Sequence, residues 1–133
     1  MKFSIVLFFL LFTSIVYSQQ AKMYPCRTAC NIGIQMSDHK SGDSISLFYF
    51  LKIVGIKPER GKFTILSYKI TMDGEGFNSE IWEVENIGEK FTENTISYFR
   101  KLRPGAYVTF DCITAKDSYG YITGLKSAFY LVR

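Results

Sequence analysis

The residues that could perform nucleophilic or acid–base chemistry are few in this sequence. It contains one histidine, His39, in the polar stretch 37–44, and three cysteines. A cysteine nucleophile needs a neighbouring base, and His39 with Cys112 is the pairing that the sequence offers. Cys112, however, lies within a strand pattern, where a lone cysteine is usually a small buried hydrophobe. We therefore expect His39 to be a solvated loop residue and Cys112 to be structural.

Two groups of carboxylates could bind a cation or move a proton. Asp73 and Glu75 offer oxygen ligands in a glycine-containing turn, but no acidic run at calcium-loop spacing follows them. The segment 80–85 holds three further glutamates, two of which alternate on one face of a predicted strand. That spacing favours a solvent-facing strand over an acid/base pair. The three are Glu80, Glu83 and Glu85.

An enzyme would need a cleft that gathers His39, Cys112 or the glutamates of 80–85, and the sequence contains no hydrolase, metalloprotease or phosphate-loop motif. A zinc site would need two ligands besides a cysteine pair, and no nearby residue supplies them. We therefore predict no enzyme activity, no metal and no cofactor.

Cys26 and Cys30 have the spacing C-x3-C close to the N-terminus. In an oxidising compartment such a pair can form a disulfide that closes a small local loop. The alternative is that both are free or pair elsewhere. A Cys26–Cys30 disulfide is the pairing that we carry forward.

Aromatic and basic side chains suggest a binding surface. The chain has nine tyrosines, and Tyr119 and Tyr121 flank a predicted hairpin tip. Tyrosine provides a large contact area with a polar end, which suits an interface. Arg100, Lys101 and Arg103 form a basic group at a predicted helix end, where they either offset the helix dipole or meet an acidic partner. These five residues are the predicted interface.

The N-terminus has the three-part pattern of a secretory signal peptide. Lys2 precedes the apolar run 4–17, and Val16 and Ser18 are small enough for cleavage after position 18. The run is shorter than the roughly 20 apolar residues of a transmembrane helix. We expect a signal peptide at 1–18 and an exported, periplasmic or secreted protein that does not span the membrane.

The rest of the chain is expected to fold as one domain. Its net charge of +4 is mild and forms no run, which argues against nucleic-acid binding. Apolar patterns bounded by turn residues predict six strands, at 31–36, 45–54, 62–72, 80–85, 106–115 and 121–132. In 62–72, the face that carries Leu66, Tyr68 and Ile70 is the more apolar and is expected to point inward.

One short helix is expected at 93–102, with Thr92 as its N-cap. The run 45–54 is apolar on both faces, which is typical of a central strand covered on both sides. These elements predict a mainly β fold, a small antiparallel sandwich or barrel. Residues 19–44 are expected as an N-terminal arm with an edge strand.

The order of elements over 45–133 carries a family resemblance. An aromatic-rich strand and a long strand precede a helix ending in the sequence LRPG at 102–105, and the strand 107–116 (YVTFDCITAK) leads into a D-x-x-G hairpin. This series resembles the C-terminal domain of the GldM family of gliding-motility proteins of Bacteroidota. The resemblance implies an immunoglobulin-like β-sandwich that makes protein–protein contacts in gliding and type IX secretion machinery, here as a stand-alone secreted relative.

Two functions are consistent with this sequence. The first is a non-catalytic, exported module that binds a protein of the cell envelope. The second is a carrier of a small, lipid-like molecule, for which the apolar faces of 45–54 and 121–132 would line the cavity of a closed barrel. A packed interior would distinguish the first from the second.

Overall fold

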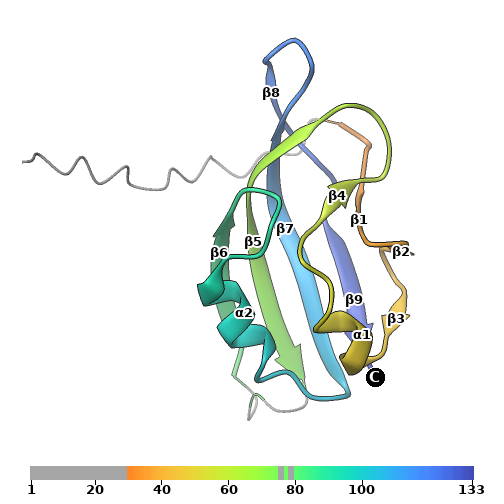
Figure 1. The fold of residues 1–133 in the computed structure, drawn as a ribbon, viewed down its shortest axis with the longest axis vertical. Coiled ribbons are helices and arrows are strands. Elements are labelled where there is room, and N and C mark those ends of the chain that lie inside the picture. The colour runs from red at the N-terminus through yellow and green to blue at the C-terminus, as the bar shows by residue number, and fades with distance from the viewer. Residues whose placement is uncertain (1–29, 75–76, 78–79) are drawn as a thin grey trace, which may run out of the picture.

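Two long antiparallel strands, β5 and β7, lie at the centre of a larger sheet with the order β3-β9-β7-β5-β6 (Figure 1). The computed structural model describes residues 30–74, 77 and 80–133. The strands of the larger sheet are β3 (Ser44–Ile45), β5 (Thr64–Gly74), β6 (Trp82–Ile87), β7 (Ala106–Lys116), β8 (Ile122–Gly124) and β9 (Ala128–Val132). β8 pairs with the end of β7 that β9 leaves free. All of these pairs are antiparallel except β3 with β9, which is parallel.

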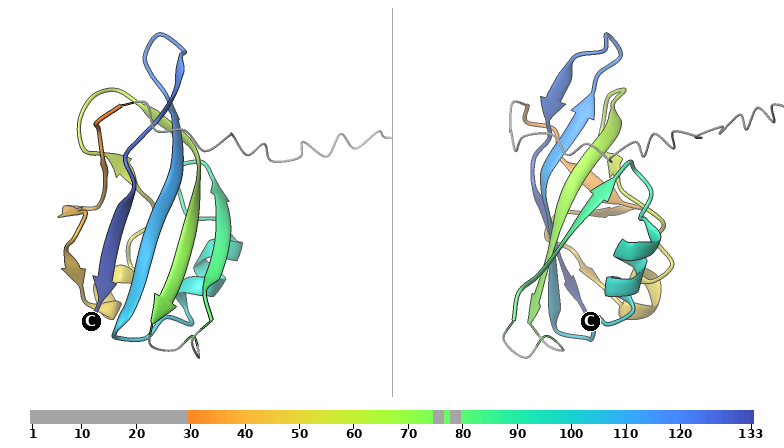
Figure 2. Two further views of the ribbon diagram at one scale, coloured as in Figure 1. Left: turned by 180° about the vertical axis from the view of Figure 1, so that it is seen from behind. Right: turned by 90° about the vertical axis from the view of Figure 1, so that its left-hand side faces the viewer.

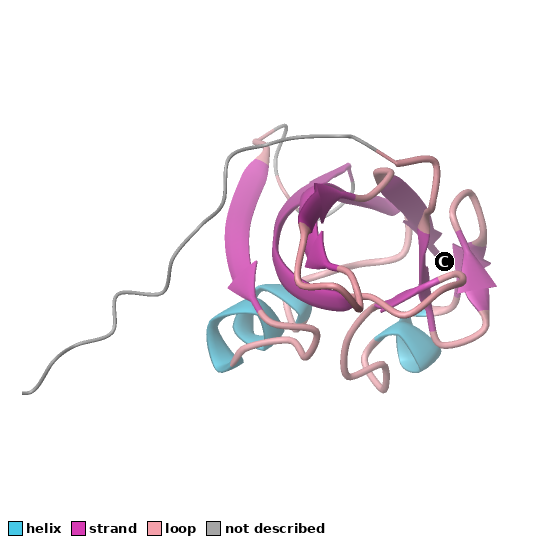
Figure 3. Cartoon of the chain, turned by 90° about the horizontal axis from the view of Figure 1, so that it is seen from above, coloured by secondary structure: helices cyan, strands magenta, loops and turns pink. Residues whose placement is uncertain are grey.

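A smaller sheet and two helices form the second layer. The sheet has the order β2-β1-β4. Its strands are β1 (Ile34–Met36), β2 (His39–Lys40) and β4 (Lys57–Pro58), and the helices are α1 (Leu47–Phe50) and α2 (Glu93–Phe99). Figure 2 (right) and Figure 3 show both helices on the same side of the larger sheet. The mainly β, two-sheet sandwich predicted from the sequence is therefore confirmed, and the described strands do not close into a barrel.

A series of aromatic rings within the core connects the layers. Phe50 of α1 packs edge-on against Phe99 of α2, with ring centroids 5.0 Å apart, and Phe99 packs against Phe91 at 4.8 Å. Phe91 in turn stacks on Phe110 of β7 at 6.1 Å. This chain of contacts fixes both helices to the sheet, because edge-to-face pairs add stabilisation beyond the area that they bury.

β5 follows the predicted alternation over most of its length. Tyr68, Ile70 and Met72 are fully buried, whereas Lys69 and Thr71 between them are partly exposed. The expected inward face is therefore right for this part of the strand.

A β-bulge reverses the faces at the other end of β5. The register with β7 shifts between Ile65 and Ser67 and again before Lys69. Ile65 is buried there and Leu66 is partly exposed, so the inward orientation predicted for Leu66 is wrong. On the β7 side, Cys112 has a φ of +49°, a left-handed conformation typical of bulges.

The second helix begins where the sequence predicts. Thr92 is its N-cap, and the Thr92 hydroxyl accepts a hydrogen bond from the Thr95 backbone N–H at 3.3 Å. The helix ends at Phe99, three residues before the predicted end. The chain turns at Arg100 and Lys101 and does not resume the helix before Pro104, because a proline disfavours helical backbone at the residue before it.

The segment 45–54 is the main correction to the predicted fold. It is expected as a central strand, but after Ile45, which ends β3, it forms α1 and a turn, so the described residues contain two helices where one was predicted. The physical reason is that a short apolar run does not distinguish a buried strand from a helix by periodicity. This segment is also the aromatic-rich strand with which the resemblance to the GldM domain begins.

Two smaller differences concern the ends of the chain. The run 121–132, expected as one strand, is divided into β8 and β9, and the polar stretch 37–44 contains β2 and the first residue of β3. The predicted signal peptide at 1–18 and residues 19–29 of the expected arm lie outside the described residues.

Candidate functional site

Four large apolar side chains are exposed within seven consecutive residues of the chain. We call them the α1 patch. Their relative exposures range from 47% to 71%, although they come from the segment that was expected to be the most buried. The α1 patch consists of Phe48, Tyr49, Leu51 and Val54.

The way in which α1 is anchored explains why these side chains face outward. Ser46 caps the helix by accepting a hydrogen bond from the Tyr49 N–H at 3.4 Å, and the Leu47 N–H donates to the carbonyl of Arg133 at 2.7 Å. Phe50 is fully buried against α2. Because Phe50 is held in the core, the residues on either side of it are turned to the surface.

Two hollows adjoin the α1 patch, and together we call them the α1–α2 groove. The first, of about 520 Å³, lies between α1 and the chain leading to β2, and its lining includes His39, Tyr49, Ile56 and Lys57. The second, of about 410 Å³, lies between the turn after α1 and α2, and its lining includes Leu51, Ile96, Phe99 and Arg100. Three residues line both hollows and so form the ridge between them: Ile53, Val54 and Lys90.

The ridge is fixed by backbone pairing between two distant segments. The Phe91 N–H donates to the Val54 carbonyl at 2.8 Å, and the Ile56 N–H donates to the Glu89 carbonyl at 3.1 Å. Gly55 and Lys90 form an antiparallel bridge between these bonds. The ridge is therefore supported by paired backbone, which favours a groove whose shape exists before any ligand binds.

Two buried tyrosines support the first hollow from the core. The Tyr68 hydroxyl donates to the Glu89 carbonyl at 3.3 Å, and the Tyr130 hydroxyl donates to the His39 carbonyl at 3.2 Å. Burial raises the pKa of Tyr68 above its ordinary value, with the Glu89 carboxylate adding to the effect, and burial also raises the pKa of Tyr130. Both phenols therefore stay neutral and keep donating; the stability that they contribute is lost only as the pH rises above the ordinary tyrosine pKa of about 10.

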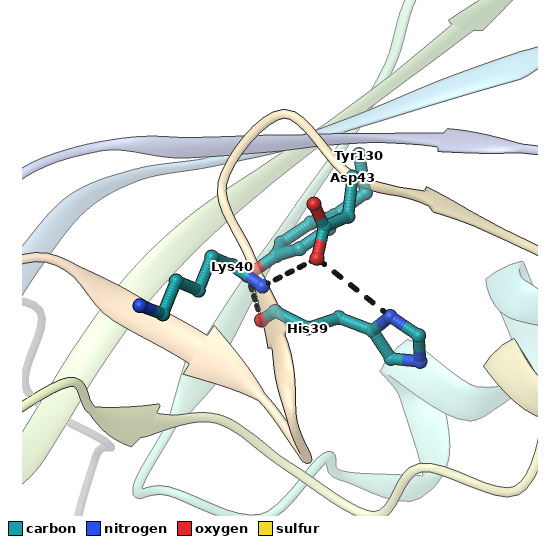
Figure 4. Close-up of polar contacts among 4 residues, drawn as sticks. All are labelled: His39, Lys40, Asp43 and Tyr130. Carbon is teal, nitrogen blue, oxygen red and sulfur yellow. Dashed lines mark hydrogen bonds and ion pairs between the residues drawn. The ribbon is translucent and has the colours of Figure 1, made fainter.

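His39 has a structural environment, shown in Figure 4. The Asp43 carboxylate accepts a hydrogen bond from the Lys40 N–H at 2.9 Å and lies 3.8 Å from His39 Nδ1. Tyr130 holds the His39 carbonyl, as described above. His39 was expected as a solvated loop residue, but it lies in β2, its ring is partly exposed, and it lines the first hollow.

The charged side chains that line the groove are mostly basic. Glu89 is the acidic one, and its carboxylate accepts a long hydrogen bond of 3.4 Å from the Ile65 N–H. Lys52 Nζ lies 3.8 Å from the centroid of the Phe48 ring, in cation–π contact. The basic lining residues are Lys52, Lys57, Lys90 and Arg100.

The five interface residues predicted from the sequence lie in different places. Tyr119 and Tyr121 are highly exposed at the hairpin before β8, at the opposite end of the molecule from α1 and α2 (Figure 1). Arg100 lines the second hollow and Arg103 is exposed. Lys101 is exposed as well, and its Nζ lies 4.9 Å from the Trp82 ring centroid, in cation–π contact.

The hairpin is ordered by one side chain. The Asp117 carboxylate accepts hydrogen bonds from the N–H groups of Tyr119 and Tyr121, both at 2.9 Å. The aromatic pair is thus displayed by a defined turn, with Gly120 at a φ of +88°.

A scan against protein-family models found no match to this chain, and a search of curated proteins likewise found none. In the part of the chain that the structure describes, no helix is long and apolar enough to cross a bilayer.

The carboxylates singled out in the sequence take up separate roles. Glu83 forms an ion pair with Lys69 at 3.8 Å, and Glu80 accepts a hydrogen bond from the Trp82 indole at 3.4 Å. Glu75 lies outside the described residues. Across residues 30–74, 77 and 80–133, no three His, Cys, Asp or Glu side chains gather as metal ligands would.

The α1 patch is the feature that the sequence interpretation missed. A signal for it was present, because Ser46 is a good N-cap and apolar residues follow at three-residue spacing. Leu47, Phe50 and Ile53 are the residues with this spacing, and all three face the core at least in part. The residues between them are the ones left on the surface.

The cysteines differ in state. Cys112 is disulfide-bonded, whereas Cys30 is free and partly buried. Cys26, the other member of the expected Cys26–Cys30 bridge, lies outside the described residues. The expectation that Cys112 is a lone buried cysteine is therefore wrong.

Thiol labelling of the unreduced, denatured protein distinguishes a disulfide at Cys112 from the expected Cys26–Cys30 disulfide. We expect iodoacetamide to label Cys30 fully and to leave Cys112 unlabelled, because a disulfide sulfur does not react with it. Peptide mass spectrometry measures both sites, and a reduced sample labelled at both is the control. Label on Cys112 with none on Cys30 would instead support the local Cys26–Cys30 bridge.

Proposed function

We propose that this protein is an exported, non-catalytic module that binds another protein of the cell envelope through the α1 patch and the α1–α2 groove. The observation that carries the proposal is the exposure of four large apolar side chains beside two apolar hollows. Contiguous exposed apolar surface beside a groove is typical of interaction sites. Aromatic anchors such as Phe48 and Tyr49 supply much of the binding energy at such sites.

The cell-envelope setting is supported by the sequence. The apolar run 4–17 favours export, and the resemblance of 45–133 to the GldM domain favours a partner in gliding or type IX secretion machinery. The groove supports a binding role in any such setting, because apolar and positively charged side chains line it. Among the described residues, no group of side chains is placed to hold a metal ion.

The groove is a better candidate for the main interface than the hairpin. Tyr119 and Tyr121 project from a narrow turn and adjoin a limited apolar surface, in which Ile122 is also exposed. Binding hot spots are concentrated in concave regions from which water is excluded, and the two hollows beside the ridge are concave. The hairpin is therefore assigned a secondary role in contact with the partner.

Site-specific photo-crosslinking in producing cells tests this proposal. A photoreactive phenylalanine analogue at Phe48 or at Val54 is expected to give the same covalent adduct with one envelope protein. Both side chains are well exposed, so neither replacement should disturb folding. Adducts are detected by immunoblotting and identified by mass spectrometry.

Thr71 provides the matched control. It lies on β5 between the buried residues Ile70 and Met72, on the face of the larger sheet away from the helices. The analogue at Thr71 should give no adduct with that protein. No adduct from Phe48 and Val54, or the same adduct from Thr71 alone, would contradict the assignment of the interface.

A further inference from the structure

We infer that the α1–α2 groove receives an acidic segment of its protein partner, with two apolar side chains that enter the two hollows. This inference rests on the proposed function and specifies the chemistry of the partner. Three observations carry it: the paired hollows, the fixed ridge between them and the excess of cations around them.

The paired hollows determine how many anchors the ligand needs. They share Ile53, Val54 and Lys90, so they lie on opposite sides of one ridge. A ligand that fills both must cross Val54, which is 71% exposed at the top of that ridge. One polypeptide segment can do so with two apolar side chains three or four positions apart, the spacing of neighbours on one face of a helix.

The fixed ridge favours a peptide segment over a small apolar molecule as the ligand. The backbone bonds from Phe91 to Val54 and from Ile56 to Glu89 keep the two hollows separate. A small apolar molecule binds best in one enclosed cavity that covers most of its surface, and the divided, open groove does not offer this. A peptide segment, in contrast, gains from two separate pockets joined by a short span of backbone.

The charges identify the polar part of the ligand. Lys52 and Lys57 border the first hollow, Arg100 borders the second and Lys90 borders both, against the single carboxylate of Glu89. Basic side chains around an apolar groove attract carboxylates and repel cations, which favours acidic partners and speeds their encounter. We therefore assign Asp or Glu residues to the positions that flank the two apolar anchors.

Selection from random peptides of about 12 residues displayed on phage tests the inference with the intact, oxidised protein as bait. Selected peptides are expected to contain at least two acidic residues and two apolar residues separated by three or four positions. The tightest of them is then synthesised and its affinity measured by fluorescence polarisation. Its version with Asn and Gln in place of Asp and Glu should bind at least about fivefold more weakly.

Variants of the protein locate the binding site. Val54→Asp is expected to weaken binding of the selected peptide about tenfold or more, and Lys90→Glu at least about threefold. Lys126→Glu is the matched control, because Lys126 is exposed and lies between β8 and β9, away from the groove. It should leave the affinity unchanged. An increase from about 0.05 M to about 0.5 M NaCl should weaken binding of the acidic peptide.

Three results would overturn the inference. Selected peptides could be neutral or basic, or their affinity could be insensitive to Val54→Asp and Lys90→Glu. Alternatively, vesicles containing about one third anionic phospholipid could bind the protein and lose that binding with Val54→Asp, which would assign the groove to a membrane surface. If photo-crosslinking at Phe48 and Val54 still captures an envelope protein, the inference alone fails; if it captures none, the proposed function fails as well.

Discussion

Replacement of Asn86 by Ala is expected to lower the free energy of unfolding by about 2 to 4 kcal/mol. The Asn86 side chain is fully buried in β6 and satisfies four groups. Its amide nitrogen donates to the carbonyls of Gly88 and Lys90 at 3.1 and 3.0 Å. Its oxygen accepts from the Thr92 N–H at 2.9 Å and from the Thr95 hydroxyl at 2.8 Å. Without the amide, these four groups lose their hydrogen bonds, and the hydroxyl of the fully buried Thr95 is left without this acceptor.

Urea denaturation followed by tryptophan fluorescence measures this effect, since the chain contains a single tryptophan. Asn94→Ala is the matched control, because Asn94 lies on the exposed side of α2 and the same atoms are removed. A change within about 0.5 kcal/mol is expected there. A loss of less than about 1 kcal/mol for Asn86→Ala, or one equal to that of Asn94→Ala, would show that the amide does not organise this turn.

The role of Asn86 extends to the candidate site. Its four bonds shape the turn from Gly88 to the start of α2, and Glu89 and Lys90 in that turn line the groove. Asn86→Ala should therefore weaken ligand binding in the groove even under conditions in which the variant remains folded. The network that holds the site together thus lies in the core, beneath the residues that contact the partner.

The parts of the fold that could be predicted depend on local physical signals. Alternation specified β5, β6 and β7, and the capping hydroxyl of Thr92 specified the start of α2. Glu83 and Glu85 were placed on the solvent side from their spacing alone, and both are exposed. In each case the determinant lies within a few residues of the element that it specifies.

The candidate site could not be predicted in this way, because it depends on contacts between distant parts of the chain. The ridge exists because the segment around Gly55 pairs with the segment around Lys90. α1 exists in its observed orientation because Phe50 packs on Phe99. From the sequence alone, the apolar run 45–54 was equally compatible with a buried strand, and the exposure of half its side chains followed only from the tertiary contacts.

The predicted interface shows the same limit. All five predicted residues are exposed, as a binding surface requires, but the sequence could not show that Lys101 lies against the Trp82 ring. Nor could it show that Arg100 faces the same hollow as Leu51. The residue types were chosen for sound reasons, and the grouping of those residues was decided by the fold.

Replacement of Gly55 by Ala is expected to lower the free energy of unfolding by about 1 to 3 kcal/mol and to weaken binding in the groove. A Cβ atom at this position would lie 2.4 Å from the Glu89 carbonyl oxygen and 3.0 Å from the Lys90 Cα. Both are backbone atoms, so the two paired segments would have to move apart. That movement would lengthen the bonds on either side of the Gly55–Lys90 bridge and merge or close the hollows that it separates.

Gly33→Ala is the control that separates a backbone clash from the general effect of adding a methyl group. Its Cβ would also meet a close neighbour, at 3.0 Å, but the neighbour is the carboxylate end of Glu59, a flexible and exposed side chain. That end can move aside, so we expect a change within about 0.5 kcal/mol and unaltered affinity for the peptide selected on the groove. If urea denaturation shows an equal loss of unfolding free energy in the two variants, the backbone around Gly55 must relieve the close approach at little cost in free energy. The ridge would then be a deformable element, and the two hollows would have to be regarded as one adaptable surface.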